Sequence, residues 1–253
     1  MKIVNDQAAP AVTLTEPSAG GYLVLAAEIG GWTGPFVLPS RRRERVLARA
    51  VHLCAELAAR DDVLEAVVFR GVLRPPGEGA EILARAGALP ARFDVVILVI
   101  TRGLDDLDEV RDDPAYRALS TEICSTAEQS YRVAAGNAAR IADVDHRRDD
   151  WFLFNYFHCD DADIVSAVWR YTAGWFQRHT ALPNSTLLRP LPGEDGDFGI
   201  VNHASWPRLR SFLPALLFSP SFRTFVLANF KANGVAAQPI MYRQARRGAA
   251  TGH

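Results

Sequence analysis

An internal repeat constrains the fold of this chain more than any other feature of its sequence. Phe93-Asp-Val-Val lines up with Phe198-Gly-Ile-Val at an offset of 105 residues. Asp113-Pro-Ala-Tyr-Arg lines up with Ser219-Pro-Ser-Phe-Arg at an offset of 106. Two matches at nearly the same offset, each in the same position of a strand-and-helix pattern, indicate that one structural unit occurs twice.

The first occurrence spans residues 21–145. Four apolar runs predict strands, at 21–28, 64–73, 92–101 and 131–135. Ser40 is a suitable N-cap for a helix after the first strand, and a second helix begins near Leu104 and is interrupted at Pro114. The predicted order of elements is therefore β-α-β-β-α-β.

The second occurrence spans residues 150–245 and repeats this order. Its predicted strands lie at 151–158, 185–191, 198–206 and 237–243. Apolar residues at helical spacing predict helices near 165–176 and 209–216, the second broken at Ser219-Pro220. Residues 1–20 show no period and are interpreted as an N-terminal arm.

A single ferredoxin-like βαββαβ unit has helices on one face of its sheet and leaves the other face uncovered. Apolar residues on that face need a second sheet to bury them. The predicted fold is therefore α+β: two ferredoxin-like βαββαβ units in tandem that form a single-chain dimeric α+β barrel. Assembly into a further homodimer is compatible with this fold but not required by it.

Charge and cysteine content limit the partners and the compartment. The chain of 253 residues has 28 basic and 29 acidic residues, so it offers no electrostatic attraction for nucleic acid or an anionic membrane. No apolar run reaches the ~18–20 residues of a membrane span. Cys54, Cys124 and Cys159 are odd in number and widely spaced, which favours a reducing compartment, and we expect a cytoplasmic protein.

The two units differ in their third strands. At the offset of 105 residues, Ile97 aligns with Asn202 and Thr101 with Trp206. A buried polar side chain without a hydrogen bond costs about 1–3 kcal/mol, so polar residues in one copy alone predict that this copy carries the function. The alternative is that this strand simply lies nearer to solvent.

Strand alternation divides the candidate residues between two faces. Asn202 and Trp206 share one face of their strand, whereas His203 points to the other. Asn155 and Phe157 share a face of the unit's first strand, and the following helix contributes Trp169. Aromatic residues with a few amides are typical of a pocket for a flat apolar ligand, although a well-filled core has the same composition.

The stretch from Ser185 to Trp206 resembles the central hairpin of the antibiotic biosynthesis monooxygenase superfamily. In both, a strand, a charged glycine-containing turn and a strand ending in Asn-x-x-x-Trp lead into a helix. The resemblance covers about fifty residues of the second unit. It implies oxygenation of polycyclic phenols without a cofactor, in which Asn202 and Trp206 hydrogen-bond the substrate oxygens.

The sequence departs from the superfamily at two positions, and each departure excludes one kind of chemistry. Phe212 stands where better-known members have a tyrosine, so that phenol cannot transfer a proton. Haem-degrading members need an axial histidine on the second helix, and residues 209–217 contain none, although Asn155 and Trp206 match that group.

From these observations we predict a cofactor-independent monooxygenase that acts on a small, apolar, aromatic polyketide-like substrate and binds no metal. The predicted catalytic residues are Asn202, Trp206 and His203, the last as a base, with His158 and His179 as alternative bases. The predicted substrate-binding residues are Asn155, Phe157, Trp169 and Phe212. Two alternatives remain open: a polyketide cyclase or isomerase on the same barrel, and a non-catalytic binding protein.

Overall fold

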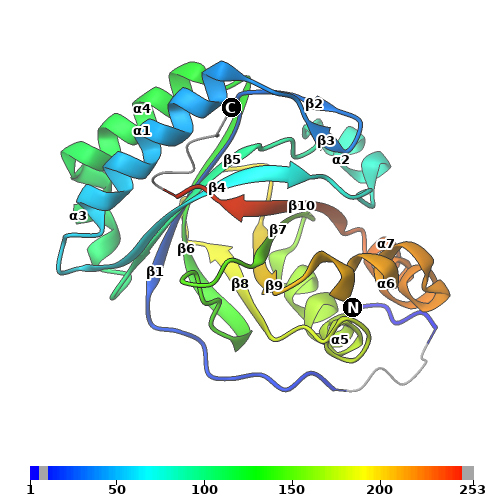
Figure 1. Cartoon of the computed structure of the whole chain (residues 1–253). Coiled ribbons are helices and arrows are strands. Elements are labelled where there is room, and N and C mark those ends of the chain that lie inside the picture. Colours follow the sequence, from blue (N-terminus) through cyan, green and yellow to red (C-terminus); the bar gives the residue numbers. More distant parts are fainter. Residues whose placement is uncertain (6–10, 247–253) are drawn as a thin grey trace.

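The computed structural model describes residues 1–5 and 11–246. Within this part, eight of the ten strands of one sheet close into an antiparallel barrel (Figure 1). Around the barrel the order is β4 (Val63–Leu73), β5 (Val95–Thr101), β1 (Gly21–Glu28), β6 (Gln129–Ala142), β8 (Asn184–Pro190), β9 (Ile200–Trp206), β7 (Trp151–His158) and β10 (Ala236–Gln244), which pairs again with β4.

The strand order is the same in each half of the barrel. In the first half the strands are, in chain order, β1, β4, β5 and β6, and their order in the sheet is β4-β5-β1-β6. In the second half they are β7, β8, β9 and β10, and their order in the sheet is β8-β9-β7-β10. In both halves the sheet order is therefore second strand, third strand, first strand, fourth strand. Two seams join the halves, where β6 pairs with β8 and β10 pairs with β4. A short hairpin of β2 (Trp32–Thr33) and β3 (Phe36–Val37) continues the sheet beyond β4.

Helices cover the outside of each half (Figure 1). In the first half these helices are α1 (Arg41–Leu57), α3 (Asp106–Asp112) and α4 (Pro114–Thr126), whereas α2 (Ala80–Ala86) lies near β3 and packs Leu83 against the barrel-interior residues. The second half has α5 (Ala162–Thr180), the short 3-10 helix η1 (Leu209–Ser211), α6 (Leu213–Phe218), the π-helix η2 (Phe222–Leu227) and α7 (Ala228–Ala232).

Alternation along the strands fills both sides of the sheet. Val24 and Leu98 point into the barrel, whereas Leu25 and Ile97 pack under α1 and α4. Aromatic rings fill the barrel interior: Phe69, Phe93, Tyr131, Phe152, Phe154, Tyr156, Phe198 and Tyr242. This accounts for the unbroken burial of β1, whose two faces are both covered.

Five local features differ from the sequence-based expectation or add to it. The strand expected at 131–135 is much longer, because β6 pairs first with β1 and then, across a seam, with β8. The β2–β3 hairpin and α2 were not expected. The helix expected near 209–216 is a series of short segments. The N-terminal arm is anchored, since Thr15 bridges to Arg140 and the Val4 amide donates to Asn229.

Candidate functional site

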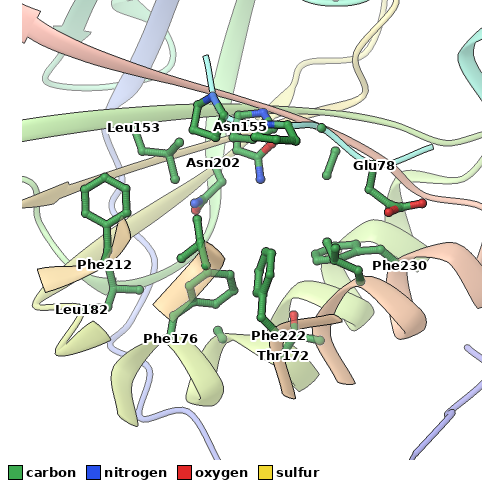
Figure 2. A pocket seen from close by; sticks show the side chains of 18 of the residues that line it. Glu78, Leu153, Asn155, Thr172, Phe176, Leu182, Asn202, Phe212, Phe222 and Phe230 are labelled. Carbon is green, nitrogen blue, oxygen red and sulfur yellow. The ribbon is translucent and has the colours of Figure 1, made fainter. Parts of the chain in front are cut away.

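A largely apolar cavity of about 310 Å3 lies between sheet and helices in the second half. Strands β7, β8, β9 and β10 form its floor, and α5, α6, η2 and α7 form its walls (Figure 2). The wall residues are mainly aromatic or aliphatic: Trp169, Phe176, Leu182, Phe212, Leu213, Leu216, Phe222, Leu227 and Phe230. Such a space suits a small, flat, apolar molecule.

Breaks in the helical layer keep this space open. Pro214 and Pro220 lack the amide hydrogen that a continuous helix needs, and the chain between α6 and η2 turns by 71°. No residue of α6 is fully buried, so this helix lies away from the sheet as an outer wall. The π-helical turn of η2, a feature often found at functional sites, forms the adjoining wall.

The structure brings six of the seven predicted site residues to this cavity. They come from two strands, from α5 and from the turn between η1 and α6: Asn155, Phe157, Trp169, Asn202, Trp206 and Phe212. Phe212 packs against the Trp206 ring with centroids 4.7 Å apart, and Phe157 stacks on Phe230 at 5.4 Å. For the four strand residues, alternation explains which of them share a face of each strand, and the pairing of β7 with β9 brings the two faces together.

His203 lies on the other face of β9, inside the barrel. Its Nδ1 donates to the Leu153 carbonyl at 3.0 Å, and its Nε2 lies 2.9 Å from Nε2 of His146, whose Nδ1 bonds to Glu65. Burial, together with the neighbouring His146 ring, lowers the pKa of His203 well below its usual range. His203 therefore does not border the cavity for which it was predicted as a base.

The two alternative histidines are also remote from the cavity. His158 points to the barrel side of β7 and bonds through Nδ1 to the Asp197 carbonyl. His179 is exposed and stacks on Trp175 at 4.7 Å between centroids. Neither is among the residues that line the cavity.

Two amides provide the polar part of the floor. Asn155 and Asn202 are directly opposite each other in the β7–β9 register. The Asn202 Oδ1 accepts a hydrogen bond from the Ser185 hydroxyl at 2.6 Å. The Nδ2 group of Asn202 has no acceptor among the described residues. The Asn155 Oδ1 is buried without a hydrogen-bond partner in the same part of the chain. Among the described residues, the floor therefore has the amide donors of both side chains and the Asn155 Oδ1 acceptor available to a ligand.

Trp206 differs from its expected role. Its indole N–H donates to Thr180 Oγ1 at 3.2 Å, and the Thr180 hydroxyl in turn donates to the Phe176 carbonyl at 2.6 Å. Because this N–H is already used at the end of α5, it does not serve as a donor to the cavity in this structure. Trp206 contributes an apolar wall instead.

Sequence reasoning missed the part of the site that comes from the first half. The segment Pro75–Glu78, which follows β4, closes one edge of the cavity because β4 and β10 are neighbours across a seam. Glu78 and Arg223 are the two titratable residues among those that line it. In the sequence, Pro-Pro-Gly-Glu-Gly indicates the end of a strand but not which distant strand lies next to it.

Among the described residues, no group of three or more His, Cys, Asp or Glu side chains could hold a metal ion. No single helix there is long and apolar enough to cross a membrane. Leu209–Phe218 and Phe222–Ala232 meet that criterion only jointly, across their 71° bend.

Comparison with solved structures identifies the fold. An anthrone oxidase-like protein superposes with a TM-score of 0.61 and 11% identity, over 95% of this chain and 99% of its own. Monooxygenase candidates from Fusobacterium nucleatum and Lactobacillus acidophilus superpose with TM-scores of 0.53 and 0.52, at 9% and 7% identity. Each match covers 91% of this chain, and 96% and 98% of the respective neighbour.

No protein-family model and no curated protein matches the sequence. At these identities the likeness is one of fold alone. The chain therefore has the α+β barrel fold of these proteins.

Proposed function

We propose that this protein is a cofactor-independent monooxygenase that oxidises a polycyclic, phenol-like aromatic molecule to a quinone. The observation that carries the proposal is the cavity of the second half, where apolar walls surround a floor with two amides. The flat walls match a fused-ring substrate, and the Asn202 donor and Asn155 acceptor match one that carries oxygen functions. The name of the anthrone oxidase-like neighbour suggests the same substrate class.

Chemically, such an oxygenase needs an electron-rich substrate anion. The negative charge that develops on the substrate oxygen accepts a hydrogen bond from Asn202 Nδ2 in a site with little water. A substrate hydroxyl donated to Asn155 Oδ1 supplies the partner that this buried atom lacks. The anion then transfers electrons to O2 directly, so the reaction needs no metal or organic cofactor.

Haem, which some proteins with this superfamily's hairpin bind, does not fit the wall. Haem iron is held by histidine, cysteine or tyrosine, and methionine ligates it together with histidine. The residues that line the cavity include Met241 but no histidine, cysteine or tyrosine. We therefore assign no step to haem.

Oxygen uptake with anthrone as the probe tests this function. Anthrone has a keto group and a methylene group on opposite sides of its central ring, and its enol is a phenol. In the expected reaction the methylene carbon becomes a second carbonyl, one oxygen atom of O2 enters the product and the other leaves as water. Protein-dependent O2 uptake with anthraquinone formation is the expected result.

The same assay separates the alternatives. Quenching of tryptophan fluorescence by anthrone without O2 uptake or product would identify a binding protein. Conversion of a polyketide without O2 uptake would identify a cyclase or isomerase. Either result would contradict the monooxygenase proposal.

We also propose that the chain arose by tandem duplication of one ferredoxin-like unit. The identical strand orders in residues 21–142 and 151–244 support this, as do the two sequence matches near one offset. On this view the first unit at 21–145 is structural and the second at 150–245 is functional. The first unit still contributes a segment to the edge of the site.

A further inference from the structure

We propose that Glu78 is the catalytic base of the cavity, contributed by the first half of the chain to the site of the second. This inference rests on the proposed function, because it assigns the group that generates the substrate anion. It replaces the histidines that the sequence suggested, which lie inside the barrel or on the surface.

The local chain is shaped to hold Glu78 at this edge. Its backbone forms a two-way bridge with Ala237 of β10, with N–O distances of 2.9 and 3.0 Å. A Cβ on Gly77 would lie 2.8 Å from the Ala237 carbonyl oxygen, so a side chain there would obstruct the bridge. Gly79 has a φ of +82°, and a Cβ there would lie 2.7 Å from Ala236. The two glycines therefore allow the loop to lie against β10 with Glu78 fixed between them.

The Glu78 carboxylate is available for chemistry. Among the described residues no cation or hydrogen-bond donor pairs with it, whereas many other carboxylates of this chain are engaged in ion pairs. The side chain is half-buried and lies at the cavity edge beside Phe230, apart from Asn155 and Asn202 (Figure 2). Glu78 and the two amides thus border different parts of one cavity. The proposed reaction requires this separation, because the proton leaves one ring position and the negative charge develops at another.

No other lining residue can accept the proton. Apart from Glu78 the wall contains Arg223, whose guanidinium has hydrogen-bond donors and no acceptor, and amides and hydroxyls, which are poor bases. In the proposed step the Glu78 carboxylate takes a proton from the anthrone methylene. The C–H electron pair moves into the ring system and onto the keto oxygen, giving the oxygen-centred anion. This anion reacts with O2 and a proton to give a hydroperoxide, which loses water to form the quinone.

Proton abstraction can be measured without oxygen. With anthrone in anaerobic D2O, NMR follows the exchange of the methylene protons, and fluorescence quenching measures affinity. Glu78→Gln should slow protein-dependent exchange by at least ~100-fold and leave anthrone affinity almost unchanged. Glu78→Asp should restore part of the rate, and Glu81→Gln, an exposed carboxylate outside the cavity, should behave as the wild type.

The outcomes separate this inference from the proposed function. Exchange that depends on Glu78 without O2 uptake by the wild type would support the base and contradict the monooxygenase. Exchange by Glu78→Gln at half the wild-type rate or more would overturn the base, whatever the O2 uptake. Wild-type exchange no faster than the protein-free rate would also overturn it.

Discussion

The two halves of the barrel have the same strand order but differ in what lies between sheet and helices. In the first half Leu25 and Ile97 are covered by α1 and α4, and the layer is solid. In the second half the equivalent layer encloses the cavity. The second helix explains the difference. In the first half α3 and α4 are interrupted only at Asp113, whereas in the second half η1, α6, η2 and α7 replace them. Where the helical layer is divided into short segments, a cavity lies in place of a packed interface.

The sharpest test of this contrast removes a leucine from each half. Leu25 is 1% exposed in the solid layer, so Leu25→Ala should lower the free energy of unfolding by about 2–5 kcal/mol. Leu216 borders an existing space and is half-buried, so Leu216→Ala should cost less than about 1.5 kcal/mol. Denaturant unfolding of both variants measures this. Equal losses would mean that the second half is as tightly packed as the first.

The donor on the cavity floor gives the next largest expected effect. Asn202→Ala should lower turnover about 10²–10³-fold, equivalent to roughly 2.7–4 kcal/mol, because it removes the anion-stabilising hydrogen bond. Its positional counterpart in the first half, Ile97→Val, should cost only about 0.5–1.5 kcal/mol of stability and leave turnover unchanged. The two are compared by steady-state kinetics at equal folded fraction. A loss of activity in Ile97→Val of the same size would place the site elsewhere.

A third test asks whether Trp206 acts as a wall or as a donor. Thr180→Val keeps the shape of the side chain but removes the acceptor of the indole N–H. We expect the unfolding free energy to fall by about 1–3 kcal/mol, because a buried donor is left unpaired, and anthrone turnover to stay within about threefold. A rise in anthrone affinity would instead show that the released N–H binds the ligand.

The smallest expected effect concerns the hydrogen-bond chain that joins the halves inside the barrel. Because burial lowers the pKa of His203, protons bind the unfolded state preferentially just below the usual histidine pKa of 6.5. Stability contributed by neutral His203 is complete above about pH 6.5 and declines as the pH falls towards the lowered pKa, by at most ~1.4 kcal/mol per pH unit. Denaturant unfolding curves measured at several pH values from about 7.5 to about 5 should show this decline in the free energy of unfolding. In His203→Gln the free energy of unfolding should depend less on pH over the same range. A wild-type protein with equal stability across this range would contradict the prediction.

The sequence predicted local arrangements and missed those that depend on contacts between distant segments. Alternation correctly placed Asn202 and Trp206 on one face of β9, with His203 on the other, and Asn155 with Phe157 on one face of β7. That the two pairs meet at one cavity depends on the pairing of β7 with β9. The helix break was visible at Pro220, but proline indicates where a helix ends and not how far the next segment diverges. The Trp206 hydrogen bond joins residues 26 positions apart, through the packing of α5 on β9.

Glu78 was beyond local reasoning for the same physical reason. Its distance from β10 along the sequence is about 160 residues, and the two meet only because the barrel closes at the β4–β10 seam. The chemical type of the residue was visible in the sequence. Its place at the edge of the cavity followed only from the closed topology.

Closure of the barrel within one chain has a thermodynamic consequence. A barrel assembled from two separate chains gains or loses stability with protein concentration, because its seams form by association. Here β6–β8 and β10–β4 form intramolecularly, so closure of the barrel itself should not depend on dilution. In a single chain the two halves of the barrel also have separate sequences. A mutation that loosens the packing around the cavity in the second half is therefore not repeated in the first half. The solid packing of the first half can then offset the loss of stability.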